Sequence, residues 1–160
     1  MAYGAFLEGQ RRYSEAVAAY SLANALSPGS PGILCNLGRC YWQLAETERA
    51  IELMERSVEL QPHNPRLKYD LAMMLHCAGR SDEALVLLDQ AMRILPGMWE
   101  APALKATILS EGGHYPEARQ LFEEAWELGA DDPSFWGAWS AMESAAGNSV
   151  RAYEVAQGLE

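Results

Sequence analysis

Apolar residues recur along the chain at intervals of three and four positions, which places them on one face of an α-helix. A representative stripe comprises Ala50, Ile51, Met54, Val58 and Leu60. The stripes come in pairs whose two members are separated by breaks at Ala45, Gly79, Gly113 and Gly147. The second member of each pair is predicted to begin near Ser14, Glu48, Asp82, Pro116 and Val150. This pattern predicts a chain of paired α-helices without a β-sheet.

The pattern repeats with a fixed period of 34 residues, which is typical of repeat proteins. Alanine occupies five positions at this spacing: Ala16, Ala50, Ala84, Ala118 and Ala152. The first helices carry a matching column of small residues: Gly4, Gly38, Ala72, Ala106 and Ser140. Small side chains in both columns predict a close approach of two helix backbones, because a larger side chain would force them apart. We therefore interpret residues 1–160 as one array with the copies 1–30 (incomplete), 31–64, 65–98, 99–132 and 133–160 (degenerate or truncated).

Three copies begin with a polar residue followed by proline, at Ser30-Pro31, Asn64-Pro65 and Asp132-Pro133. A polar side chain in the N-cap position accepts a free backbone N–H, and proline in the first helical position gives up no hydrogen bond. These dipeptides predict three capped helix starts.

The second copy carries Leu34, Leu37, Gly38 and Tyr41, followed by Ala50, Met54 and Pro62, and in this it resembles the tetratricopeptide repeat. The resemblance covers essentially the whole chain. It implies an all-α fold, a right-handed superhelical solenoid of about five antiparallel helix pairs whose first helices line a concave face. The last copy also resembles the half-a-tetratricopeptide variant of RNA-processing proteins, through Trp136, Trp139, Glu143, Gly147, Asn148 and Arg151.

The fourth and fifth copies depart from the repeat pattern at three positions. Lys105 and Glu143 stand where large apolar residues are usual, and Pro102 lies early in a first helix. The phase of residues 99–112 therefore stays open at this point.

The concave face is the expected binding surface. A stripe of helical spacing on the second copy reads Gly32, Cys35, Asn36, Arg39 and Gln43, and its counterpart on the third reads Arg66, Tyr69, Asp70, Met73 and Cys77, with His76 at its edge. An asparagine amide both donates to and accepts from a peptide bond, and arginine holds carboxylates. We predict that a peptide segment or partner helix binds to Asn36, Arg39, Arg66, Tyr69, Asp70, Met73 and His76. The alternative is that these residues are merely solvated.

Some tetratricopeptide repeat proteins hold the terminal carboxylate of a chaperone with a clamp of basic and asparagine residues. Asn36 and Arg66 match two clamp positions, but Asp70 reverses the charge at a third. A heat-shock chaperone tail is therefore not the expected ligand.

The chain is acidic, with 22 acidic against 12 basic residues and a net charge of −10. An acidic surface repels phosphate groups, which disfavours nonspecific binding of nucleic acids and anionic membranes. Residues 99–132 contribute most of this charge, with eight acidic and two basic residues. These acids are expected on a solvated helix face, or alternatively as a patch for a basic partner.

No catalytic, cofactor or metal site is predicted. His63 and His114 fall in turns, and Cys35 and Cys77 are too far apart along the groove to share a metal ion. The three cysteines show no metal-binding spacing, which favours reduced thiols and a cytoplasmic location. No run of 18 apolar residues predicts a membrane helix.

Together these features predict a non-enzymatic module that binds a protein partner in its concave groove. One alternative is a scaffold that self-associates through its ends, since Val150, Tyr153 and Val155 on the last helix have no following helix to cover them. The other is the docking region of a longer enzyme or RNA-linked protein.

Overall fold

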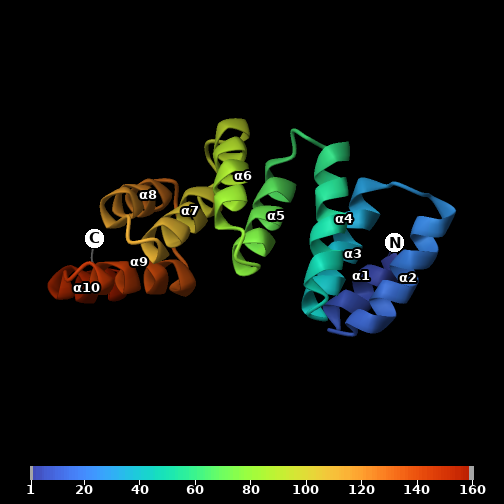
Figure 1. Cartoon of the computed structure of the whole chain (residues 1–160). Helices are drawn as coiled ribbons and strands as arrows, with labels where there is room; N and C mark the ends of the chain where they lie inside the picture. Colours follow the sequence, from blue (N-terminus) through green and yellow to red (C-terminus); the bar gives the residue numbers. More distant parts are fainter. Residues whose placement is uncertain (1, 159–160) are drawn as a thin grey trace. The chain divides into compact units, whose positions relative to one another are not determined.

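The computed structural model describes residues 2–158, and every regular element in this range is an α-helix (Figure 1). The helices are α1 (Ala2–Gly9), α2 (Tyr13–Leu26), α3 (Pro31–Gln43), α4 (Thr47–Leu60), α5 (Pro65–Cys77), α6 (Ser81–Ile94), α7 (Glu100–Glu111), α8 (Tyr115–Glu127), α9 (Pro133–Ala145) and α10 (Ser149–Ala156). The predicted all-α fold is confirmed, and each second helix begins one residue before its predicted start. Residue 1 and residues 159–160, at the ends of the predicted first and last copies, lie outside the described range.

The chain divides into two compact units, the first ending at Ala84 and the second beginning at Leu85. In the first unit, the helices from α1 to α5 pack in chain order, each against the next. Their core includes Leu7, Ala16, Tyr20, Ile33, Leu37 and Cys40. In the second unit, α8 packs against both α7 and α9, and α9 also contacts α7 and α10.

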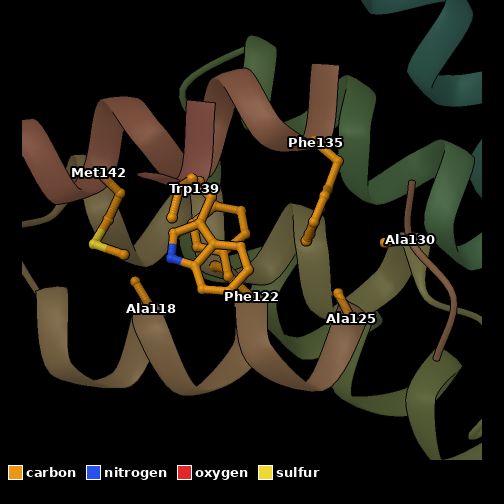
Figure 2. Packing of buried hydrophobic residues seen from close by; sticks show 9 residues of the cluster. Ala118, Phe122, Ala125, Ala130, Phe135, Trp139 and Met142 are labelled. Carbon is orange, nitrogen blue, oxygen red and sulfur yellow. The ribbon is translucent and has the colours of Figure 1, made fainter. Parts of the chain in front are cut away.

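The core of the second unit is rich in aromatic rings (Figure 2). Phe122 of α8 stacks on Trp139 of α9 with a centroid distance of 5.9 Å and an interplanar angle of 6°. Phe135 meets the Trp139 ring edge to face at 5.8 Å. Ala118 and Ala125 flank Phe122 on the same side of α8, where small side chains leave room for the rings.

The alanine column lies where the sequence predicts, between closely packed helices. All five of its residues are buried, with exposed fractions from 0% to 5%. A methyl group added to Gly38 would come within 3.1 Å of the Ala50 carbonyl oxygen, so the two backbones nearly touch there. In the last copy the Ser140 hydroxyl donates a hydrogen bond of 2.8 Å to the Ala152 carbonyl.

Two of the three predicted N-caps are confirmed. Asn64 accepts from the backbone N–H groups of Arg66 and Leu67, and Asp132 accepts from those of Ser134 and Phe135. At Ser30 the predicted helix start is confirmed, but the predicted cap by its side chain is wrong.

The side chain of Ser30 makes no cap hydrogen bond. Its backbone carbonyl instead accepts from both Ile33 and Leu34, at 3.0 Å each. That tighter first turn satisfies the Ile33 donor without the hydroxyl.

The predicted end of the α4 stripe is also wrong. Leu60 is 52% exposed, whereas Ser57 is fully buried and donates a hydrogen bond of 3.0 Å to the Pro31 carbonyl. Ser57 shares a 34-residue column with Ala23 and Ala91, so its small size fits this close contact.

The departures in the fourth copy leave its phase intact. Pro102 is buried in the first turn of α7, where a missing backbone N–H costs no helical hydrogen bond. Lys105 extends to an ion pair with Asp89, and Ala106 of the small column is fully buried. Residues 99–112 therefore follow the same register as the other copies.

Of the three apolar residues of α10 that were predicted to be uncovered, only two are exposed. Val150 and Tyr153 are 75% and 68% exposed, but Val155 is fully buried. It belongs to the hydrophobic cluster around Trp139, so its side chain is already covered within the unit.

The predicted breaks between paired helices coincide with left-handed backbone. Gly79, Gly113 and Gly147 have φ between 80° and 82°, and Ala45 at the equivalent position has φ of 60°. A left-handed conformation costs a residue with a Cβ atom about 1–2 kcal/mol, whereas glycine adopts it without a steric penalty.

We therefore expect Ala45→Gly to raise the free energy of unfolding by about 0.5–1 kcal/mol, after the greater entropy of the unfolded glycine chain is subtracted. Gly79→Ala should lower it by about 1 kcal/mol. Urea unfolding followed by circular dichroism measures both. A destabilised Ala45→Gly protein would contradict this assignment.

Candidate functional site

The first unit contains a groove of about 810 Å³ lined mainly by α1, α3 and α5. Five of the seven residues predicted to bind a partner line it: Asn36, Arg39, Arg66, Asp70 and Met73. On both α3 and α5 the lining residues follow helical spacing, so each helix turns one stripe toward the groove. Three further residues complete the wall: Asn64, which caps α5, and Tyr13 and Tyr20 of α2.

Two ion pairs define the electrostatics of this groove. Arg39 of α3 contacts the Glu8 carboxylate of α1 at 2.6 Å, and Arg66 contacts Asp70 one turn later on α5 at 3.1 Å. The arginine side chains are 51% and 60% exposed, whereas those of Glu8 and Asp70 are only 17% and 14% exposed. The guanidinium groups therefore face solvent and the carboxylates lie beneath them.

The pKa values of the buried groups follow from this layout. Burial raises the pKa of the Asp70 carboxyl, while the charges of Arg66 and Arg39 act in the opposite direction. Burial, and secondarily the Asp70 charge, raises the pKa of the Cys35 thiol. A raised pKa keeps this thiol protonated at neutral pH, so it is not a nucleophile. Because both arginines act on Asp70 and Cys35, their positive charges converge on one part of the groove.

On the far wall of the groove, a tyrosine hydroxyl supports Glu8. Tyr20 donates a hydrogen bond of 3.2 Å to the Glu8 carboxylate. Burial, together with the adjacent Glu8 charge, raises the pKa of Tyr20 to about 12, so the hydroxyl keeps its proton. Glu8 is thus held by Tyr20 and Arg39 from two different helices.

Tyr69 and His76 are not among the residues that line this groove. The Tyr69 ring lies under the Arg66 guanidinium, with 5.1 Å from its carbon to the ring centroid. His76, at the last turn of α5, lies 3.1 Å from the Ser81 hydroxyl through its Nδ1 atom. The structure thus places Tyr69 as a support for Arg66, and His76 at the junction with α6.

Sequence reasoning missed Glu8. Stepping the α3 stripe back by one period reaches Ala5 and Gly9 of α1, which both line the groove, so the spacing could have brought α1 into the site. Glu8 itself corresponds to Trp42, which lines the groove but lies outside the predicted stripe.

The second unit contains a buried carboxylate, Glu143, whose oxygens accept hydrogen bonds from neighbouring side chains. Glu143 is fully buried and accepts two hydrogen bonds of 2.6 Å from Arg119, one of 2.9 Å from Asn148 and one of 3.4 Å from the Trp139 ring nitrogen. Burial alone would raise the pKa of Glu143, but Arg119 and these donors lower it below the ordinary value. Glu143 is therefore a charged, fully bonded group rather than a free acid or base.

Other candidate chemistry is sparse in residues 2–158. No group of three histidine, cysteine or acidic side chains in this range is arranged to hold a metal ion. The thiols of Cys35, Cys40 and Cys77 are free, with Cys40 buried and Cys77 exposed. None of the described helices combines the length and apolar character needed to cross a membrane.

Comparison with known proteins identifies relatives of most of the chain. The family described as Tetratricopeptide repeat matches residues 7–72 and 75–141. The human protein O-mannosyl-transferase TMTC1 is 31% identical over 101 residues, which are 63% of this chain and 12% of that protein. The BBSome complex member BBS4 of mouse is 24% identical over 133 residues, 83% of this chain and 26% of that protein. The chain thus spans about an eighth and a quarter of these two relatives.

Solved structures of repeat proteins share this fold. The crystal structure of MamA superposes with a TM-score of 0.84 at 16% identity, covering 99% of this chain and 93% of that one. YrrB, described as a TPR protein with an unusual peptide-binding site, gives a TM-score of 0.77 at 18% identity, covering 100% and 84%. The family match, the paired helices and the 34-residue register agree, and the chain belongs to the tetratricopeptide repeat family.

Proposed function

We propose that this chain is a protein-interaction module whose groove on α1, α3 and α5 holds an extended peptide that carries a carboxylate. The fold supports a role in protein–protein interaction generally, and the groove supplies the finer assignment. The observation that carries it is the pair of half-exposed guanidinium groups, Arg39 of α3 and Arg66 of α5, that line one cavity.

The exposure pattern favours an anionic ligand over a cationic one. An approaching lysine would have to displace an arginine before it reached Glu8 or Asp70, because both carboxylates are largely covered. An approaching carboxylate meets the guanidinium groups directly. Each guanidinium has five N–H donors, so it can bind a ligand while it keeps part of its contact with Glu8 or Asp70.

The peptide backbone has its own candidate partner in Asn36. Its side chain is half-buried on α3, one turn before Arg39, and lines the same cavity. A side-chain amide donates to a peptide carbonyl and accepts from a peptide N–H, independently of the ligand's sequence. Recognition would then combine Asn36 for the backbone with the two arginines for acidic side chains or a terminal carboxylate. The likeness to YrrB, which is described as having a peptide-binding site, is consistent with this use of the fold.

A peptide array with matched Asp/Glu and Asn/Gln sequences tests the assignment. Arg66→Glu should weaken binding of the acidic peptides by about 10- to 100-fold, since a charge-assisted hydrogen bond is lost and a repulsive charge is introduced. Asn36→Ala should weaken binding of both sets by about tenfold. The control is Arg56→Glu, the same charge reversal on the exposed side of α4, outside the groove. Binding that survives both groove variants, or that Arg56→Glu abolishes equally, would refute this site.

A second candidate function is supported by the length of the relatives. The chain matches a short part of a human transferase and of a mouse complex member, so we also propose that it can act as the docking region of a longer protein. In either case we propose one continuous, non-enzymatic array over residues 1–160. The three free thiols support a reducing compartment such as the cytoplasm.

A further inference from the structure

Asp70 contacts the arginine of α5 that the proposed function assigns to the ligand. Its Oδ1 atom lies 3.1 Å from the Nε atom of Arg66, and its side chain is only 14% exposed. The Arg66 guanidinium also lies over the Tyr69 ring, with 5.1 Å from its carbon to the ring centroid. Two neighbours on α5 thus hold this guanidinium, and one of them carries the same charge as an acidic ligand.

The other charged and titratable groups around Asp70 line the same groove. They are Arg66 of α5, Arg39 and Cys35 of α3, Glu8 of α1, and Tyr13 and Tyr20 of α2. Among the described residues, α4 and α6 supply none of the groove lining. At neutral pH the two arginines balance Glu8 and Asp70, so the empty groove carries no net charge. A ligand carboxylate therefore adds an uncompensated negative charge.

This added charge would lie close to Asp70, because the ligand and Asp70 would contact one guanidinium. Two carboxylates that share a site repel each other, and the repulsion is relieved when one of them takes up a proton. Asp70 is suited to accept it, since burial already disfavours its charged form and raises its pKa. The charges of Arg66 and Arg39 oppose this effect in the empty groove, and a bound carboxylate would offset part of that opposition.

We propose that Asp70 is a specificity-determining residue of the groove, which competes with an acidic peptide for Arg66 and takes up a proton when that peptide binds. This inference rests on the proposed function and adds a regulation of the same site. The complex would then hold more protons than the empty groove, so the affinity for acidic peptides rises as the pH falls. A matched peptide with Asn and Gln brings no charge and gains nothing from the proton.

Isothermal titration calorimetry with an acidic peptide from the array tests the proton uptake. The peptide stays ionised from about pH 7.5 to about pH 5.5, because the ordinary pKa values of its Asp and Glu side chains are about 3.9 and 4.3. Over this range the dissociation constant of the wild-type chain should fall about 3- to 10-fold, since a pKa shift of one unit changes the affinity at most tenfold. Buffers of different ionisation enthalpy should show an uptake of up to about one proton per bound peptide.

Asp70→Asn removes the competing charge and keeps the shape of the side chain. At neutral pH it should bind the acidic peptide about tenfold more tightly than the wild type, and its affinity should not change with pH. The matched control is Asp89→Asn, which makes the same change in net charge at an aspartate of α6 that pairs with Lys105 outside the groove. This control should bind and respond to pH like the wild type.

Three results would overturn the inference: an Asp70→Asn protein that binds acidic peptides no more tightly than the wild type, an equal gain in Asp89→Asn, or a wild-type chain that takes up no proton. A pH dependence that persists in Asp70→Asn would also overturn it, and would assign the effect to another group such as a histidine. Unchanged helical circular dichroism would show that both variants are folded. If neither the wild type nor Asp70→Asn binds acidic peptides, the proposed function itself fails, whereas equal binding by both refutes only the role of Asp70.

Discussion

Replacing Trp139 with alanine should lower the free energy of unfolding of the second unit by about 3–5 kcal/mol. The Trp139 ring is fully buried and stacks on Phe122 and on Trp136, at 5.9 Å and 5.8 Å between centroids. Its ring nitrogen also donates to Glu143 at 3.4 Å. Alanine would leave a cavity bounded by rings and helix backbone that cannot close it fully.

Trp126→Ala provides the control, because it removes a ring of the same type that is 37% exposed. The Trp126 ring is not stacked: it meets Trp136 edge to face at 6.3 Å and lies tilted against Trp139 at 6.5 Å. Its loss should cost roughly 1–2 kcal/mol, since much less apolar area returns to water. Chemical unfolding followed by far-UV circular dichroism suits both variants, because tryptophan fluorescence changes with either substitution. Similar losses in the two variants would show that Trp139 is not the centre of this core.

Much of the fold could be predicted from the sequence, because a repeat reports the same contact several times. One buried alanine is unremarkable, but five at a constant spacing identify a close helix contact, and all five are buried. The caps of Asn64 and Asp132 depend only on neighbouring residues, so they too could be predicted from the sequence. The side-chain cap predicted for Ser30 is absent because its hydroxyl competes with its own backbone carbonyl for the same N–H donors. The local sequence does not decide which of the two oxygens accepts.

The groove could be predicted in part. Helix geometry fixes which residues of α3 and α5 share a side, so Asn36, Arg39, Arg66, Asp70 and Met73 follow from spacing. The ion pair between Arg39 and Glu8 does not, because it joins side chains of separate copies whose rotamers depend on the packed structure.

Tyr69 and His76 show the limit of spacing arguments at the edge of a stripe. Tyr69 lies next to the groove-lining Asp70 but supports the Arg66 guanidinium, and His76 lies beyond Met74, the last groove-lining residue of α5, and contacts Ser81. A rotation of one residue around a helix, about 100°, separates a position that lines the groove from one that does not.

The Glu143 departure has an explanation that only the structure supplies. Its column otherwise holds Leu7, Tyr41, Leu75 and Leu109, and the column of its partner Arg119 otherwise holds Val17, Ile51, Leu85 and Tyr153. This copy therefore has an ion pair between α8 and α9 at two positions that are apolar in the other copies.

Because both positions are apolar in the other copies, we expect Arg119→Leu to lose about 3–5 kcal/mol of folding free energy, as the fully buried Glu143 carboxylate then keeps only Arg151, at 3.4 Å, as a charged partner. Glu143→Leu should lose about 1.5–3 kcal/mol, because the Arg119 side chain that it leaves behind is 28% exposed and can reach water. The double variant should fall within about 1–3 kcal/mol of the wild type, since it restores the apolar character of both columns and loses only the acceptor that Glu143 offers to Asn148, Trp139 and Arg151. A double-mutant cycle from urea unfolding at pH 7 measures the coupling between the two residues. If the two losses added up in the double variant, Arg119 and Glu143 would not be energetically coupled, which would contradict this interpretation of the ion pair.

The pH dependence gives an independent reading of the same pair. The pKa of Glu143 lies below its ordinary value of 4.5 in the folded chain, because its hydrogen-bond donors outweigh the cost of burial. Its contribution to stability is therefore complete above pH 4.5 and is lost as the pH falls through the lowered pKa. The double variant has no carboxyl group at this position and does not lose this contribution. Below pH 4.5 the wild type should therefore lose more unfolding free energy than the double variant does. If that difference stayed constant between pH 7 and pH 3, Glu143 would not be an ionised partner of Arg119 in the folded chain.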